Sequence, residues 1–300
     1  SPAISLKRAS SRVFPSNFLR GISAVRMGAA TIDIVTFDID GTICVSDKIT
    51  QGVVGNAMHR GAYTHAFQTV CGFEASIDEV PHHGMTDPLI LIKVQVHRGL
   101  SHDTACSNLD ALKQAMVEYA AAHPAVDSKH NGLVLLPGVK DLLEALHARE
   151  NVHVGLVTGN LEPIAWSKMK ALGIRHLFSE PPFGGFGSDF CGMDISKGAE
   201  DRAQLVRVAA ERVGAAMPGV KVGRRVHIGD APSDVSAAHI AGAVAIGVTT
   251  GVFDSEELRA AVPTCLVLPD LACTHTVLEV LGLSSAAPNG TSSTLAKYNT

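Results

Sequence analysis

The sequence lacks the features of several protein classes. With a net charge of −4 over 300 residues, it has no excess of basic residues for binding nucleic acid. No apolar run approaches the roughly 18 residues that a membrane-spanning helix needs. The 6 cysteines include no C-x-x-C pair, and the 14 histidines include no H-E-x-x-H motif. The cysteine spacing therefore predicts neither a zinc site nor a disulfide framework, and it favours a reducing compartment.

The two ends of the chain differ in composition from the rest. Residues 1–30 contain basic residues and several serines but no acidic residue. This composition is typical of an organelle transit peptide, or equally of a basic disordered leader that precedes a start at Met27. We therefore expect the protein in the cytoplasm, or in mitochondria or plastids if the leader is a transit peptide. Residues 284–300 are expected to form a frayed tail.

Short, β-rich apolar runs alternate with helical patterns along most of the chain. Strands are expected at 31–38, 152–158, 226–229, 244–248 and 265–268. Helices are expected near 138–149, 161–172, 201–215, 233–242 and 272–282. Such alternation predicts an α/β fold, in which a Rossmann-like parallel sheet is covered by helices on both faces.

The stretch from residue 50 to about 130 interrupts this alternation. Its apolar residues recur every three or four positions, as in Leu89, Ile92 and Val96, and it contains no convincing strand. A structureless loop of this length is implausible inside a compact domain. We therefore expect a helical cap at 49–131, inserted into a core formed by 31–48 and 132–283.

Two carboxylates, Asp38 and Asp40, end the first expected strand and directly precede Gly41 and Thr42. Residues two apart on a strand project to the same side, so both would face one pocket at the carboxyl edge of the sheet. Open α/β sheets bind their ligands at that edge. Carboxylates this close persist if a cation neutralises them or if one carries a proton. Both conditions suit phosphoryl transfer.

Polar residues also follow the expected strands at 152–158 and 226–229. Thr158 ends the first of these and precedes Gly159 and Asn160. A threonine hydroxyl and backbone N–H groups at a helix start can bind an anion, although such a sequence is also an ordinary turn. Asp230 and Asp234 follow the second strand. Few carboxylates suffice for Mg²⁺, which keeps several waters, but Asp234 could instead cap the next helix.

These segments resemble, in family order, motifs of the haloacid dehalogenase-like hydrolase superfamily: Asp38 to Thr42, Thr158 to Asn160 and Gly229 to Asp234. The inserted helices resemble the α-helical cap of its phosphoglycolate phosphatase-like branch. The resemblance covers about 31–282. It implies a Mg²⁺-dependent hydrolase of a small phosphomonoester, such as 2-phosphoglycolate or a sugar phosphate. A phosphomutase of the same fold and a non-catalytic binding protein are the alternatives.

The resemblance also implies a role for each motif residue. Asp38 would attack phosphorus, and Asp40 would act as general acid and base, a role that needs a raised pKa. The metal-binding group would comprise Asp38, the Asp40 backbone carbonyl, Asp230 and Asp234. The phosphate would be bound by Gly41, Thr42, Thr158, Gly159 and Asn160. A small phosphorylated molecule is the only partner expected, and no pattern indicates an oligomeric state.

Two further assignments come from the resemblance. The family places a cation near the nucleophile, and Arg202 is preferred for it because relatives with the stretch Gly185 to Asp189 often carry arginine there. Lys197 is the alternative. The segment Gly84 to Ile90 resembles a cap segment that faces the active site, which adds Thr86 and Asp87 to the candidates. Either of these two residues could also be the N-cap of the helix that follows.

Overall fold

The structure is a computed structural model that describes residues 30–46, 56–123, 125 and 132–283. The expected leader up to residue 29 and the expected tail lie outside the described residues. So do residues 49–55 and 126–131 at the two ends of the expected cap. No helix in the described part is both long and apolar enough to cross a membrane.

A six-stranded parallel sheet forms the core, in the order β5-β4-β1-β6-β7-β8. This confirms the predicted fold class. The strands are β1 (Thr31–Phe37), β4 (Val152–Thr158), β5 (Gly184–Phe186), β6 (Lys221–Gly229), β7 (Val244–Val248) and β8 (Leu266–Leu268). Strand β5 was not expected, because two of its three residues are glycines. The other five strands lie where the apolar runs were found.

The central strand β1 is buried on both faces. Ile32 and Ile34 pack into one apolar cluster, whereas Val35 and Phe37 pack into another on the opposite face. Continuous burial of this kind is typical of a parallel sheet covered on both sides. Phe37 lies opposite Leu156 of β4 and Ile228 of β6, so these three strands end at the same level.

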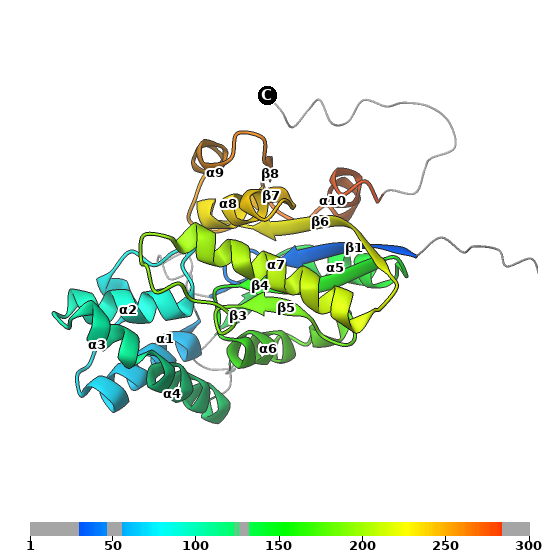
Figure 1. The fold of residues 1–300 in the computed structure, drawn as a ribbon. Coiled ribbons are helices and arrows are strands. Elements are labelled where there is room, and N and C mark those ends of the chain that lie inside the picture. Colours follow the sequence, from blue (N-terminus) through cyan, green and yellow to red (C-terminus); the bar gives the residue numbers. More distant parts are fainter. Residues whose placement is uncertain (1–29, 47–55, 124, 126–131, 284–300) are drawn as a thin grey trace, which may run out of the picture.

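Helices cover both faces of the sheet (Figure 1). One face is covered by α5 (Val139–His147), α6 (Glu162–Ala171) and α10 (Thr274–Val280), with the 3-10 turn η4 (Arg175–Leu177) after α6. The other face is covered by α7 (Gly198–Ala216), α8 (Pro232–Ile240) and α9 (Ser255–Ala261). All five predicted core helices are present, with ends shifted by a few residues.

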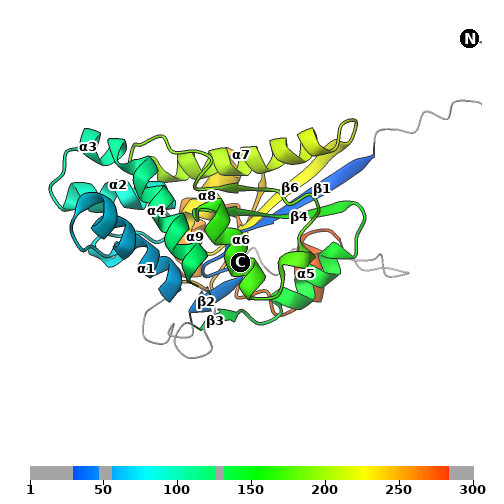
Figure 2. The ribbon, with the colours of Figure 1, turned by 90° about the horizontal axis from the view of Figure 1, so that it is seen from below.

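The helical insert lies beyond the carboxyl ends of the strands (Figures 1 and 2). Its elements are α1 (Ala57–Ala66), the π-helical turn η2 (Phe67–Cys71), the 3-10 turn η3 (Ile77–Glu79), α2 (Asp87–His97), α3 (His102–Ser107) and α4 (Leu109–Ala122). They enclose an apolar cluster that also takes in Leu161 and Ile164 of the core, so the insert packs on the start of α6. We call these helices the cap.

A short antiparallel pair joins cap and core. Strand β2 (Cys44–Ser46) follows the Asp38 to Thr42 segment, and its partner β3 (Leu133–Leu135) follows the cap. The sequence did not predict this pair, because each strand has only three residues and its partner lies on the far side of the cap.

Candidate active site

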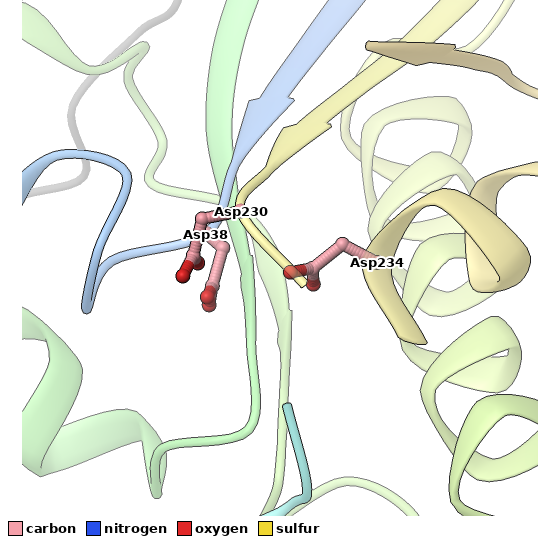
Figure 3. A group of neighbouring side chains, drawn as sticks. All are labelled: Asp38, Asp230 and Asp234. Carbon is pink, nitrogen blue, oxygen red and sulfur yellow. The ribbon is translucent and has the colours of Figure 1, made fainter. Parts of the chain in front are cut away.

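Three aspartates from different elements converge at the carboxyl edge of the sheet (Figure 3). Asp38 follows β1, Asp230 follows β6, and Asp234 lies in the first turn of α8. One carboxylate oxygen of each lies within 4.8 Å of those of the other two. All three side chains are buried. The structure thus brings together the carboxylates that the sequence placed at the ends of two separate strands.

Arg202 is the cation beside this group. Its Nη2 lies 2.7 Å from Asp38 Oδ1, and its Nε lies 2.5 Å from Asp234 Oδ1. Arg202 is therefore ion-paired to both carboxylates. The alternative cation, Lys197, is exposed and lies 3.6 Å from Asp194. The geometry therefore brings Arg202, and not Lys197, to the carboxylates.

The three buried carboxylates carry more negative charge than the neighbouring arginine neutralises, and burial shifts their pKa values. Loss of water raises the pKa of Asp38 to about 6, against the opposing effect of Arg202. Burial, together with the charges of Asp234 and Asp38, raises the pKa of Asp230 well above its ordinary value. Burial would also raise the pKa of Asp234, but Arg202 and His227 outweigh it and lower that pKa. One arginine does not balance three buried carboxylates, so the site favours a further cation.

The surroundings of Asp230 fit a small divalent ion. A Cβ atom on Gly41 would lie 2.3 Å from Asp230 Oδ2, and Gly41 has a φ of +88°. Thr42 donates its hydroxyl proton to Asp230 Oδ1 at 3.3 Å. Asp234 already faces Arg202 and accepts the N–H of Ala231 at 3.0 Å, so it also helps to cap α8, as the alternative interpretation expected. Asp38 and Asp230 therefore have the most freedom to bind an ion. Oxygen donors alone suit Mg²⁺.

Asp40 lies beside a residue that the sequence did not single out. Lys168 of α6 is fully buried, and its Nζ lies 2.6 and 2.8 Å from the two Asp40 carboxylate oxygens. Asn160 Nδ2 donates to Asp40 Oδ2 at 3.1 Å. Burial would raise the pKa of Asp40, but the charge of Lys168 and the hydrogen bonds from Lys168 and Asn160 outweigh it and lower that pKa. The expected raised pKa of Asp40 is therefore wrong, because the buried Lys168 stabilises the charged form of this carboxylate.

A signal for Lys168 was nevertheless present in the sequence. Ile164 and Ala165 precede it by four and three positions, and both are buried. Residues at these spacings share one face of a helix, so Lys168 occupies a position where an apolar residue would be expected. A lysine on the buried face of a helix indicates a buried partner for its charge.

The expected phosphate-binding segment lies next to these groups. Thr158 is fully buried, and its hydroxyl accepts the N–H of Asn160 at 3.3 Å. Gly159 and Asn160 line the cavity above Asp38 and Asp40. A Cβ atom on Gly159 would lie 2.4 Å from the Met85 carbonyl oxygen of the cap, so glycine permits this close approach.

The cap forms the other wall of the cavity, which has a volume of about 90 Å³. The cap residues facing it include His59, Tyr63, His82, His83 and Asp87. Apart from Asp87, none of these residues was predicted as a site residue, and the adjacent His82 and His83 are typical of a polar surface loop.

Thr86 and Asp87, the two candidates of the cap segment, differ in their hydrogen bonds. Thr86 is the N-cap residue of α2, but its side chain makes no capping hydrogen bond. Asp87 is the first residue of α2, so its assignment as an N-cap is wrong. Its carboxylate instead accepts the N–H of Leu161 at 2.9 Å and the Tyr63 hydroxyl at 2.7 Å. Asp87 therefore links the cap to the start of α6.

Known proteins resemble this chain over most of its length. A phosphoglycolate phosphatase from Pseudomonas fluorescens is 25% identical over 266 residues, which cover 86% of each chain. Solved structures of a hydrolase from Pseudomonas syringae (22% identity) and of a predicted phosphoglycolate phosphatase from Haemophilus somnus (20%) have TM-scores of 0.52. These two matches cover 83% of this chain and 99% and 98% of theirs. The sequence pattern of the haloacid dehalogenase-like hydrolases matches residues 32–242. This chain therefore belongs to the haloacid dehalogenase-like hydrolase family.

Proposed function

We propose that the protein is a Mg²⁺-dependent phosphomonoester hydrolase that acts through a phosphorylated Asp38. The observation that carries this proposal is the environment of Asp38. Its buried carboxylate lies between Arg202 and Asp230 and opens into the same small cavity as Asp40. A nucleophile, a cation and a metal-binding carboxylate at one point are what phosphoryl transfer requires.

In the first half-reaction, an Asp38 carboxylate oxygen attacks phosphorus, and the bond from phosphorus to the ester oxygen breaks. Asp40 gives its proton to that leaving oxygen. In the second, Asp40 takes a proton from water, whose oxygen attacks phosphorus and releases Asp38 and inorganic phosphate. Lys168 lowers the pKa of Asp40. A phosphate dianion close to Asp40 has the opposite effect, because a like charge raises the pKa of a carboxyl group.

The other residues of the site bind and orient the phosphoryl group. Arg202, which is ion-paired to Asp38 and Asp234, is placed to bind phosphate oxygens beside the nucleophile. The backbone of Gly159 and Asn160 faces the same space. Asp38 and Asp230 would hold Mg²⁺, with the Asp40 carbonyl and Asp234 as further candidates. When bound, the ion neutralises charge that develops on the phosphoryl oxygens.

The substrate that we propose is small, either 2-phosphoglycolate or a sugar phosphate. The cavity of about 90 Å³ has little room beyond a phosphoryl group and a short leaving group. The likeness to a phosphoglycolate phosphatase supports the same choice. At 25% identity it does not separate 2-phosphoglycolate from other small esters.

A phosphate-release screen with Mg²⁺ tests the function. We expect release of inorganic phosphate from at least one small phosphomonoester, and complete loss of that activity in Asp38→Asn. Turnover that persists in Asp38→Asn would show that the nucleophile is another residue. Isomerisation that depends on a bisphosphorylated activator, without phosphate release, would indicate a phosphomutase. No turnover of any compound in the panel would indicate a binding protein.

A further inference from the structure

Lys168 is at the centre of a hydrogen-bonded network around Asp40. Its Nζ contacts three acceptor groups: the Asp40 carboxylate, Asn160 Oδ1 at 2.6 Å and His59 Nδ1 at 3.3 Å. An ammonium group has three N–H donors, so it can supply one to each acceptor. Because Lys168 is fully buried, these three groups take the place of water around it.

The network continues through His59 to Asp87. Because Lys168 can only donate, Nδ1 of His59 must accept, and the ring therefore carries its proton on Nε2. Nε2 lies 3.1 Å from Asp87 Oδ2 and donates to it. Asp87 also accepts from the Tyr63 hydroxyl and from the Leu161 N–H. Every bond in the network thus has one donor and one acceptor.

This network crosses from the cap to the core. His59 and Tyr63 lie one helical turn apart on α1, on the same face, and Asp87 begins α2. Lys168 and Asp40 belong to the core. The cap is fixed at the same place by the backbone, since the N–H of Asp87 donates to the Gly159 carbonyl at 2.8 Å. Side chains of the cap therefore reach the proposed acid and base through a single lysine.

We propose that His59 and Asp87 are positioning residues for Asp40, and that they act through Lys168. This inference rests on the proposed function. Without His59, one N–H of Lys168 has no acceptor, and the ammonium group is free to turn away from Asp40. The Asp40 carboxylate then loses the orientation from which it delivers a proton to the leaving oxygen. The Asp40 carboxylate is therefore aligned for proton transfer only when the cap is docked on the core.

The test compares two substrates that differ in their need for a proton. Acetyl phosphate releases acetate, which leaves without protonation, whereas glycerol phosphate releases an alkoxide, which needs a proton from Asp40. For His59→Ala, we expect kcat/KM to fall about 100-fold with glycerol phosphate and less than about threefold with acetyl phosphate. The control is His65→Ala, on the exposed face of the same helix, and it should change neither value.

The outcomes separate this inference from the proposed function. If the unmodified protein with Mg²⁺ hydrolyses neither substrate, the proposed function is wrong for these esters and the inference fails with it. If it hydrolyses both, but His59→Ala loses the same factor on each or behaves like His65→Ala, the positioning role alone is wrong.

Two milder variants keep the test valid if His59→Ala does not fold. Tyr63→Phe keeps the ring but removes one hydrogen bond to Asp87, and Asp87→Asn keeps the shape of the side chain. Both variants should lose more activity with glycerol phosphate than with acetyl phosphate. The activities are measured below the unfolding temperature of each variant, where the protein is folded. Equal losses on the two substrates in both variants would overturn the positioning role.

Discussion

Gly251 lies so close to Asp230 that a Cβ atom there would come within 1.7 Å of Asp230 Oδ2. Gly251→Ala should therefore displace the Asp230 carboxylate and weaken Mg²⁺ binding. We expect the rise in unfolding temperature on addition of Mg²⁺ to be mostly lost, together with activity. Gly214→Ala is the control, because a Cβ atom on this helical glycine meets nothing within 4 Å. It should stabilise the protein by about 1 kcal/mol and leave Mg²⁺ binding unchanged.

Arg202→Met should abolish turnover and strongly destabilise the protein. The substitution removes the ion-pair partner of the buried Asp38 and leaves Asp234 with only His227 beside it, which costs about 3–5 kcal/mol of the free energy of unfolding. Urea denaturation measures this loss. The matched control is Lys197→Met, which removes an exposed cation and should change that free energy by less than about 0.5 kcal/mol. Equal effects of the two variants would contradict the proposed role of Arg202.

The stability of the metal-free protein should fall as the pH rises from about 4 to about 6. Burial raises the pKa of Asp38 from 3.8 to about 6, so protonation of Asp38 stabilises the folded protein. This contribution is fully present below pH 3.8 and is lost by about pH 6. The expected loss is about 3 kcal/mol. The raised pKa of Asp230 adds a loss in the same direction. Asp40 and Asp234 have lowered pKa values, so their contributions change only below 3.8.

Mg²⁺ should offset this loss, because it binds the deprotonated carboxylates. The measurement is urea denaturation at a series of pH values, with a chelator and with Mg²⁺. The stabilisation by Mg²⁺ should be larger above about pH 6 than near pH 4, where bound protons compete with the ion. If the stability of the metal-free protein rose with pH, this result would contradict the inference that the three buried aspartates have an excess of negative charge.

Thr86→Val should make the protein more stable and weaken substrate binding. The Thr86 hydroxyl is fully buried and has no hydrogen-bond partner in the described part of the chain. Replacing it by a methyl group of similar shape should add about 1 kcal/mol to the free energy of unfolding. If the hydroxyl contacts substrate, as we predict, KM should rise about fivefold. Thr69→Val, at an exposed position, is the control, and an unchanged KM in Thr86→Val would remove Thr86 from the substrate site.

The position of the site could be predicted from the sequence because parallel strands end at a common edge. Polar residues directly after two apolar runs were enough to place Asp38 and Asp230 near one another. The cap could be predicted because its helices repeat apolar residues at helical spacing over a long stretch. These features depend on local patterns and on one general rule of sheet topology.

The partners of the charged groups could not be predicted in the same way. The charge state of Asp40 depends on Lys168, which comes from α6 and meets it only in the folded chain. The strand β5 and the β2–β3 pair are held by their neighbours in space, since three residues carry little pattern of their own. The position of Lys168 on the buried face of a helix indicates that its charge has a partner, but no local pattern identifies Asp40 as that partner.

The central strand β1 acquires its two neighbours late in synthesis. Residues 31–37 leave the ribosome long before β4 at 152–158, and longer still before β6 at 221–229. Until then, an apolar strand exposes unpaired backbone N–H and C=O groups, which are a template for aggregation. A fragment that stops before residue 221 would keep one such open side. We therefore expect the nascent chain to need chaperones more than the completed protein does.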